Sequence, residues 1–326
     1  MKTQIGQNIR SLRCKRQVSQ EDLAETIGVT VQAISKWETG KANPDLLLLP
    51  KLAEYFGVTI DYLFFVDEAE NMLSEDSTQL LEQNSNWWAG VDESDMTTTA
   101  LPNYGFFTPT EDTLCLLGDV RGKSVLEIAC GNGESLLWLD KKGAKELWGL
   151  DISATQIKRA RHHLKENGKT ANLFVSPMEL NPGLPHSYFD LVFSIYGIGW
   201  SMDLDKTILH ISEYLKPGGK LVFTWDNPLM QCISSENGKY VLSRSYVEEE
   251  DVLICRPYME EAFHLRNWKL STYLNCLAAH GFLIEQVVEE SSYDEKEAET
   301  FQEGRFYSAD RAKFFNPSII IKAKKL

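Results

Sequence analysis

The stretch "SVLEIACGNGES" (Ser124–Ser135) leads from a run of mostly apolar residues into a turn that contains two glycines. Val125, Leu126 and Ile128 are residues typical of a buried strand, whereas "ESLLWLDKKG" after the turn repeats apolar side chains at helical spacing. The glycines therefore lie where a strand gives way to a helix. A turn of this kind lets a ligand approach the backbone closely.

The spacing of the glycines argues against two common classes of ligand. Dinucleotide-binding folds use the pattern GxGxxG at such a turn, but Leu136 occupies the sixth position here. The chain also lacks the GxxxxGK[ST] pattern of a phosphate-binding loop. We therefore expect the turn to hold a ligand without a diphosphate.

A second predicted strand, "ELWGLD", ends in Asp151, eighteen residues beyond Gly133. An acidic side chain at the carboxyl end of a strand can accept hydrogen bonds from both hydroxyl groups of a ribose. The alternative is that Asp151 caps the helix predicted to begin in "ISATQ". The spacing favours a nucleoside ligand.

Two later segments, "FDLVFSIYGIGW" (residues 189–200) and "YLKPGGKLVFTW" (residues 214–225), predict two further buried strands. The second segment begins with a helix end and a proline-glycine turn. Strands and helices thus alternate along the chain, which is typical of an α/β doubly wound, Rossmann-like sheet.

These four motifs resemble, in order and spacing, those of the class I S-adenosylmethionine-dependent methyltransferases, over roughly residues 100–326. The resemblance implies S-adenosylmethionine as cofactor and S-adenosylhomocysteine as product. By the same resemblance, Asp151 holds the ribose and Ile152 packs on the adenine. The methionine portion and the methyl group are then surrounded by Glu127, Ala129, Gly131, Gly133, Ser194 and Tyr196. For Glu127 the alternative is a salt bridge at the end of the strand.

The segment "VSPMEL" (residues 175–180) departs from the family pattern. The family often has an acidic residue here that bonds the adenine amino group, and this chain has Pro177 instead. Met178 can still pack on the adenine ring, and its backbone N–H can meet the base. The departure weakens one expected polar contact with the cofactor and leaves the expected fold unchanged.

Methyl transfer from a sulfonium is an in-line displacement. The protein therefore has to orient and desolvate the acceptor and, for some acceptors, remove a proton from it. Tyr196 and His264 are the candidate catalytic residues, although a lone histidine in this setting is more often structural. Aromatic residues that either cap the site or belong to the core are Trp87, Trp88, Tyr104 and Phe107. The adjacent His162 and His163 diverge on a helix, and there is no CxxC pair, so no metal site is predicted.

The first 66 residues predict a different kind of domain. Ser19 and Asp22 form a capping box, Gly28 ends the helix that follows, and Thr30 can cap the next one. Two short helices that meet across "GVT" have the geometry of a helix-turn-helix, in which the second helix enters the major groove of DNA.

Residues 9–63 resemble the Cro/repressor-type (XRE family) DNA-binding domain. The resemblance places Ala24, Ile34 and Trp37 in the core. It places five polar side chains near base edges or phosphates: Gln20, Gln32, Ser35, Lys36 and Lys41. The alternative is that Gln32, Ser35 and Lys36 form a solvent-exposed helix face that does not contact DNA. A dimer on a two-fold DNA site is expected.

Charge is unevenly distributed along the chain, whose net charge is −14. Residues 1–66 contain eight basic and seven acidic residues, for a net charge of +1, which leaves 25 basic and 40 acidic residues, or −15, in the remainder. The predicted domains are a DNA-binding domain at 1–66, an acidic linker at 67–84 that can be partly helical, and a methyltransferase domain at 85–326. The acidic remainder repels phosphate backbones, so DNA binding depends on the first domain.

The sequence predicts a DNA-binding methyltransferase that acts on a small-molecule acceptor, in the manner of the ubiquinone-biosynthesis-like enzymes, and takes part in transcription regulation. One alternative is a transcriptional regulator whose second domain only senses S-adenosylmethionine. The other is a DNA methyltransferase, although "FSIYGIGW" lacks the (N/D)PP(Y/F) signature of amino-methylating DNA enzymes. Six scattered cysteines and the absence of an apolar leader or membrane segment predict a cytoplasmic protein without a membrane partner, and a homodimer is expected.

Overall fold

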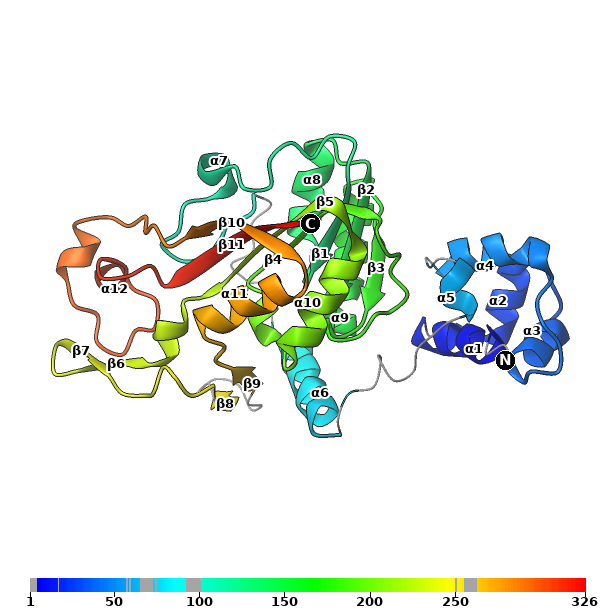
Figure 1. The fold of residues 1–326 in the computed structure, drawn as a ribbon, viewed down its shortest axis with the longest axis horizontal. Coiled ribbons are helices and arrows are strands. Elements are labelled where there is room, and N and C mark those ends of the chain that lie inside the picture. The colour runs from blue at the N-terminus through cyan, green and yellow to red at the C-terminus, as the bar shows by residue number, and fades with distance from the viewer. Residues whose placement is uncertain are drawn as a thin grey trace. The chain divides into compact units, whose positions relative to one another are not determined.

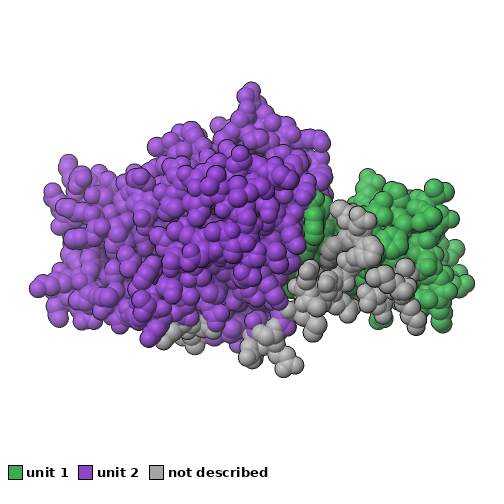
Figure 2. Space-filling view, viewed as in Figure 1, with its two compact units in different colours: residues 1–72, 180–186 green, residues 73–179, 187–326 purple. Residues whose placement is uncertain are grey.

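The computed structural model describes residues 5–16, 18–56, 58, 60–64, 73, 75–91, 101–249, 251–254 and 263–326 (Figure 1). These residues divide into two compact units, which Figure 2 colours separately. The first unit takes in residues 1–72 together with 180–186, and the second takes in residues 73–179 and 187–326.

The first unit is helical. Its elements are α1 (Ile5–Lys15), α2 (Gln20–Ile27), α3 (Val31–Glu38), the short 3-10 turn η1 (Leu46–Leu48), α4 (Leu49–Phe56) and α5 (Ile60–Phe64). The predicted capping signals are confirmed: Ser19 and Asp22 form a reciprocal capping box at α2, and Thr30 caps α3. Gly28 ends α2 in the left-handed conformation, with φ of 82°.

The core of this unit is made of the apolar faces of its helices. Ala24, Ile34 and Trp37 are buried there, as the sequence predicts. A buried carboxylate also joins two helices, because Arg13 Nε of α1 lies 2.6 Å from Glu38 Oε1 of α3. Helices α1, α2 and α3 therefore share one core.

The second unit is built on a seven-stranded sheet with the order β10-β11-β5-β4-β1-β2-β3 (Figure 1). The strands are β1 (Ser124–Ile128), β2 (Glu146–Asp151), β3 (Asn172–Val175), β4 (Phe189–Ile195), β5 (Leu215–Asp226), β10 (Phe282–Val288) and β11 (Ser318–Lys325). Strands β1 to β5 pair in parallel, whereas β11 is antiparallel to both β5 and β10. The predicted α/β Rossmann-like fold is thereby confirmed.

Helices and hairpins surround this sheet. Helices α8 (Glu134–Lys141) and α9 (Ala154–Glu166) pack on β2 and on each other, whereas α10 (Leu204–Tyr214) and α11 (Leu270–Ala279) pack together and contact β5 and β10, respectively. The remaining helices are α6 (Glu75–Gly90), α7 (Glu111–Leu114), α12 (Ala309–Ala312) and the short turns η3 (Ile198–Trp200), η4 (Pro228–Gln231) and η5 (Glu297–Glu299). Two hairpins complete the unit: β6 (Ile233–Glu236) with β7 (Lys239–Leu242), and β8 (Asp251–Ile254) with β9 (Phe263–Arg266).

The order of the strands reverses at β1. The chain runs from β1 outward through β2 to β3, and then returns to place β4 on the other side of β1. Open α/β sheets bind ligands at such a switch point, outside the carboxyl ends of the strands. The glycine turn after β1 and the loop after β4 meet at this point.

The predicted acidic linker, residues 67–84, which the sequence allows to be partly helical, is helical in its second half. Residues 67–72 and 74 lie outside the described residues, whereas Glu75 begins α6, which runs to Gly90 and belongs to the second unit. The Asn84 side chain of α6 bonds both the N–H and the carbonyl of His264 on β9. The helix is therefore fixed to the second unit by contacts that its polar composition did not reveal.

Candidate functional site

The glycine turn after β1 has a constrained backbone. Ala129, Gly131 and Gly133 all have positive φ angles, of 57°, 50° and 79°. A Cβ atom on Gly133 would lie 3.2 Å from the Cβ of Ala160 on α9, so glycine also allows close helix packing there. The Cys130 N–H donates to the Leu150 carbonyl over 3.0 Å, which fixes the turn to the end of β2.

Asp151 organises the same turn from the end of β2. Its Oδ2 accepts the Gly131 N–H at 2.9 Å and its Oδ1 accepts the Ser153 N–H at 2.8 Å. Helix α9 is capped by Ser153, so the alternative interpretation of Asp151 as the helix N-cap is wrong. Burial raises the pKa of the Asp151 carboxyl to about 6. Each carboxylate oxygen keeps a lone pair for a ligand hydroxyl.

Glu127 is a buried carboxylate in β1 that is only partly satisfied. Its side chain is 3% exposed, and its Oε2 atom has no hydrogen-bond partner among the described residues. The ion pairs found in the described part of the chain do not include it, so the strand-end salt bridge gains no support. Burial, together with the nearby Asp151, raises the pKa of Glu127 well above its usual range. An orphaned buried acceptor of this kind fits a cationic ligand group.

The end of β4 is joined to the end of β1 through Ser194. The Ser194 hydroxyl is buried and donates to the Ile128 carbonyl over 2.9 Å. A Cβ on Gly197 would lie 2.4 Å from Ser194 Oγ and 2.5 Å from the Cβ of Ala129. The structure therefore brings the loop after β4 directly against the glycine turn, and the hydroxyl of Ser194 serves this junction.

Tyr196 has a strained and enclosed position just after β4. Its φ is 52°, its hydroxyl bonds the hydroxyl of Ser318 on β11, and a Cβ on Gly105 would clash with its ring. Burial, reinforced by the carboxylate of Asp226, raises the pKa of Tyr196 well above its usual range. The phenol therefore stays neutral at physiological pH, which disfavours a role of Tyr196 as general base.

His264 is not brought together with Tyr196. It lies on β9 between Phe263 and Leu265, whose buried side chains share one face of that strand. Because side chains alternate along a strand, His264 and Arg266 face the opposite side. The imidazole thus points away from the aromatic side chains near the end of β4, and its catalytic role remains a hypothesis from the sequence.

The loop after β3 lies beside the end of β2, since the Ser176 N–H donates to the Asp151 carbonyl over 2.9 Å. Met178 is half-buried on this loop, and Ile152 is half-buried next to Asp151, with its carbonyl accepting the Ser85 hydroxyl of α6. Glu179 was missed by sequence reasoning, although it stands two positions after Pro177. Its Oε1 accepts the Met202 N–H at 2.7 Å, and its buried Oε2 has no partner among the described residues.

Five aromatic side chains gather beyond the ends of β4 and β5, and we call them the aromatic cluster: Trp87, Trp88, Trp200, Trp225 and Phe263. The Trp200 ring centroid lies 5.6 Å from that of Trp87 and 5.0 Å from that of Phe263. The cluster continues to Tyr196, whose ring centroid lies 5.8 Å from that of Trp225. Tyr104, in contrast, is a core residue that donates its hydroxyl to Glu111.

In the first unit, Gln32, Ser35 and Lys36 lie on one face of α3, at positions i, i+3 and i+4. Gln32, Lys36 and the neighbouring Lys41 are exposed, and Ser35 is half-buried. Gln20 at the start of α2 donates its side-chain amide to Glu38 over 2.7 Å. The same Glu38 pairs with Arg13, so its carboxylate fixes the orientation of Gln20.

The residues around the glycine turn fit S-adenosylmethionine. The orphaned Glu127 oxygen suits the ammonium group, and the Asp151 carboxylate at the end of β2 suits the ribose hydroxyls. No described helix is both long and apolar enough to cross a membrane.

Comparisons with known proteins separate the same two regions. The family model "Helix-turn-helix" matches residues 9–63, and the family model "Methyltransferase domain" matches residues 126–223. Over 105 residues, 31% of this chain and 50% of the relative, the chain is 33% identical to the HTH-type transcriptional activator BcrR of Enterococcus faecalis.

Two further relatives match the second region. One, from Methanocaldococcus jannaschii and provisionally named a protein N5-glutamine methyltransferase, is 33% identical over 135 residues, covering 35% of this chain and 68% of the relative. The other, a ubiquinone/menaquinone biosynthesis C-methyltransferase from Laribacter hongkongensis, is 32% identical over 112 residues, covering 34% of this chain and 46% of the relative. The chain thus spans between about half and two thirds of the length of these curated relatives.

A solved structure shows the same fold. It is an S-adenosylmethionine-dependent methyltransferase from Mesorhizobium loti, with a TM-score of 0.53 and 23% identity, and the match covers 65% of this chain and 95% of that one. The names of the relatives differ in the acceptor that is methylated, so the acceptor must be argued from the site itself.

Proposed function

Because the chain belongs to the S-adenosylmethionine-dependent methyltransferases and carries a helix-turn-helix domain, we propose that it is a DNA-binding enzyme that methylates a small apolar or aromatic molecule. The aromatic cluster is the observation that carries the acceptor class. It includes Trp200 and adjoins Tyr196, both from the segment after β4, and Gly197 of that segment packs on the glycine turn. An acceptor bound there would lie next to the predicted methyl side.

The cofactor site follows from the switch point. When bound, S-adenosylmethionine supplies an electrophilic methyl group on a sulfonium. The Glu127 carboxylate would bind its ammonium group, and the Asp151 carboxylate would bind the ribose hydroxyls. Ile152 and Met178 would enclose the adenine from the loops after β2 and β3, which are joined by the bond from Ser176 to Asp151.

The acceptor side would work mainly by orientation and exclusion of water. Aromatic faces stack well on flat or apolar molecules, and the large area of Trp200 and Trp225 would remove water from around the acceptor. The Tyr196 ring, held in place by the bond from its hydroxyl to Ser318, would help to position the acceptor by packing. Holding the acceptor in line with the methyl group lowers the barrier through proximity.

Charge favours a small acceptor over DNA. The residues after position 66 carry a net charge of −15, which opposes the phosphate backbone of a duplex. DNA would instead be bound by Gln32, Ser35, Lys36 and Lys41 in the first unit. We propose a homodimer on a two-fold DNA site, in the cytoplasm, where the free thiols found at Cys14, Cys115, Cys130, Cys232 and Cys276 would stay reduced.

The test uses the full chain with S-adenosylmethionine labelled in its methyl group, offered a metabolite extract or DNA. Label in a small organic-soluble product supports the proposal. Label in DNA supports a DNA methyltransferase. Tight cofactor binding with label in neither pool supports a regulator that only senses S-adenosylmethionine.

A pair of tryptophan variants then tests the acceptor site. Trp200→Ala is expected to lower turnover at least tenfold with cofactor affinity unchanged, because it removes one wall of the acceptor site. Trp138→Ala is the matched control, since Trp138 lies on α8 beside Lys142 and outside the aromatic cluster. Equal turnover in the two variants would contradict the proposed acceptor site.

A further inference from the structure

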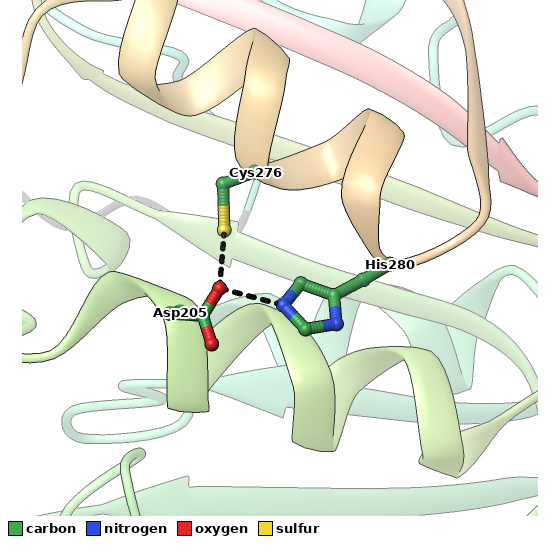
Figure 3. Close-up of side chains that lie close together, drawn as sticks. All are labelled: Asp205, Cys276 and His280. Atoms are coloured by element: carbon green, nitrogen blue, oxygen red, sulfur yellow. Dashed lines mark hydrogen bonds and ion pairs between the residues drawn. The ribbon is translucent and has the colours of Figure 1, made fainter.

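Helices α10 and α11 bring together three side chains that the methyltransferase site does not use, and we call them the α10–α11 cluster: Asp205, Cys276 and His280 (Figure 3). Their ligand atoms all lie within 4.8 Å of one another. His280 Nε2 lies 2.8 Å from Asp205 Oδ1, and Cys276 Sγ lies 4.0 Å from the same oxygen. Figure 3 shows the three side chains converging between the two helices.

The local structure explains this convergence. Cys276 and His280 are four residues apart at the end of α11, so they project from the same face of the helix. Asp205 lies in the first turn of α10, whose start is capped by Asp203. The His280 carbonyl also accepts the Ser212 hydroxyl of α10 at 2.9 Å, which fixes the end of α11 against α10.

The chemistry of the three groups is that of a transition-metal site. A thiolate, an imidazole and a carboxylate are the protein ligands that Zn²⁺ takes in tetrahedral sites, at about 2.3, 2.0 and 2.0 to 2.2 Å. Such bonds at tetrahedral angles separate the ligand atoms by about 3.3 to 3.7 Å. The observed separations bracket this range, and the Asp205 side chain, which is 73% exposed, can adjust by rotation.

We propose that Asp205, Cys276 and His280 bind one Zn²⁺ ion, with the fourth coordination position open to the adjoining cleft. The cleft has a volume of about 630 Å³ and is lined by Asp205 and Cys276 together with Met202, Arg266, Trp268 and Thr272. Three protein ligands and an open position allow water or a ligand from the cleft to complete the coordination. The ion would also join α10 to α11.

The electrostatic surroundings favour a cation at this place. Asp203 and Asp205 both line the cleft beside Cys276, and a divalent cation between the ligands would offset their negative charge. The competing interpretation is an ion pair between Asp205 and His280 with a thiol beside it. This inference does not rest on the proposed methyl acceptor, because none of the three residues belongs to the candidate cofactor or acceptor site.

The experiment uses the full chain after treatment with a chelator, titrated with Co²⁺ as a coloured substitute for Zn²⁺. We expect one Co²⁺ per chain, with a ligand-to-metal charge-transfer band from the thiolate and the visible bands of a tetrahedral ion, both abolished when Zn²⁺ is added. Cys276→Ser should abolish the charge-transfer band, and His280→Ala should weaken binding by about tenfold or more. Cys115→Ser is the matched control, because Cys115 is a thiol of the second unit that lies directly after α7 and outside the α10–α11 cluster.

A second measurement separates loss of the ligand from loss of the fold. Zn²⁺ should raise the thermal unfolding midpoint of the parent chain and of Cys115→Ser, but not that of Cys276→Ser, whose circular dichroism should be unchanged. Two results would overturn the inference: no charge-transfer band in the parent chain, or a band that persists in Cys276→Ser. Either would leave the three residues as an ion pair with a neighbouring thiol.

Discussion

Replacing Glu127 by Gln should strengthen the fold of the cofactor-free protein and weaken cofactor binding. Glu127 is buried in β1 with one oxygen unpartnered among the described residues, so its ionised form is costly in the absence of a ligand. Gln keeps the shape and removes the charge. A hydrogen bond to a charged group contributes about 1.5 to 3 kcal/mol, so affinity for S-adenosylmethionine should fall roughly tenfold to a hundredfold.

The contribution of Glu127 to the stability of the fold depends on pH in a defined direction. The folded-state pKa of Glu127 lies well above the unfolded value, so the folded protein binds more protons and its stability falls as pH rises from the unfolded toward the folded pKa. The cost is about 1.4 kcal/mol for each unit by which the pKa is raised. Glu127→Gln should remove this fall, so its unfolding free energy near neutral pH should exceed that of the parent chain.

Calorimetry and denaturant unfolding together provide the assay. Binding of the cofactor ammonium favours the Glu127 carboxylate, so the parent chain should release a proton on binding, which calorimetry in buffers of different ionisation enthalpy detects. Glu111→Gln is the matched control, because the Glu111 oxygens accept the N–H groups of Leu116 and Leu117. That variant should lose stability and keep its affinity. Unchanged affinity of Glu127→Gln, with no proton release by the parent chain, would refute the assignment of Glu127 to the ammonium group.

Three further changes test the other parts of the molecule. Asp151→Ala should lower cofactor affinity about tenfold or more by calorimetry, because it removes hydrogen bonds of about 1 to 3 kcal/mol, and an unchanged affinity in the folded variant would contradict the ribose assignment. Lys36→Ala should weaken DNA binding, measured by fluorescence anisotropy. It should also reduce by about one the slope of the logarithm of the binding constant against the logarithm of the salt concentration, so an identical slope would argue against a phosphate contact. A chain of residues 73–326 should keep nearly full turnover. A chain of residues 85–326 should be less stable in thermal unfolding, because it loses the first half of α6 and the bonds from Asn84 to His264. Equal stability of the two chains would show that residues 73–84 are dispensable.

Elements with local signals could be predicted from the sequence. The capping box at Ser19 and Asp22, the left-handed Gly28 and the cap at Thr30 are hydrogen bonds among near neighbours, so the residues that make them stand together in the chain. Strands β1, β2 and β4 are buried on both faces and read as continuous apolar runs. Their order with the intervening helices was enough to indicate the sheet.

Elements that depend on distant partners could not be predicted. Strand β3 has only four residues, with its two ends exposed, and it is defined by pairing with β2. Strand β11 enters the sheet between β5 and β10, in antiparallel pairing with segments far away in the chain. The long antiparallel addition at that edge has no short-range sequence signal, so it was absent from the expected fold.

The same distinction applies to the candidate sites. The pattern around Glu127 and Asp151 could be found because it lies in one strand-turn-helix-strand unit. The hydroxyl of Tyr196, in contrast, bonds Ser318, 122 residues away, a contact that only the fold reveals. The α10–α11 cluster shows both cases, because Cys276 and His280 have a visible helical spacing, whereas Asp205 comes 71 residues before Cys276.

Helix α6 changes how the connection between the two domains should be understood. The sequence favoured an acidic linker that transmits little strain, but the second half of α6 forms part of the wall around the candidate site. Ser85 bonds the carbonyl of Ile152 on the adenine side, Gln156 donates to the Trp88 carbonyl, and Trp87 packs in the aromatic cluster. Helix α6, which follows the DNA-binding domain in the chain, therefore contacts both the proposed adenine side and the aromatic cluster.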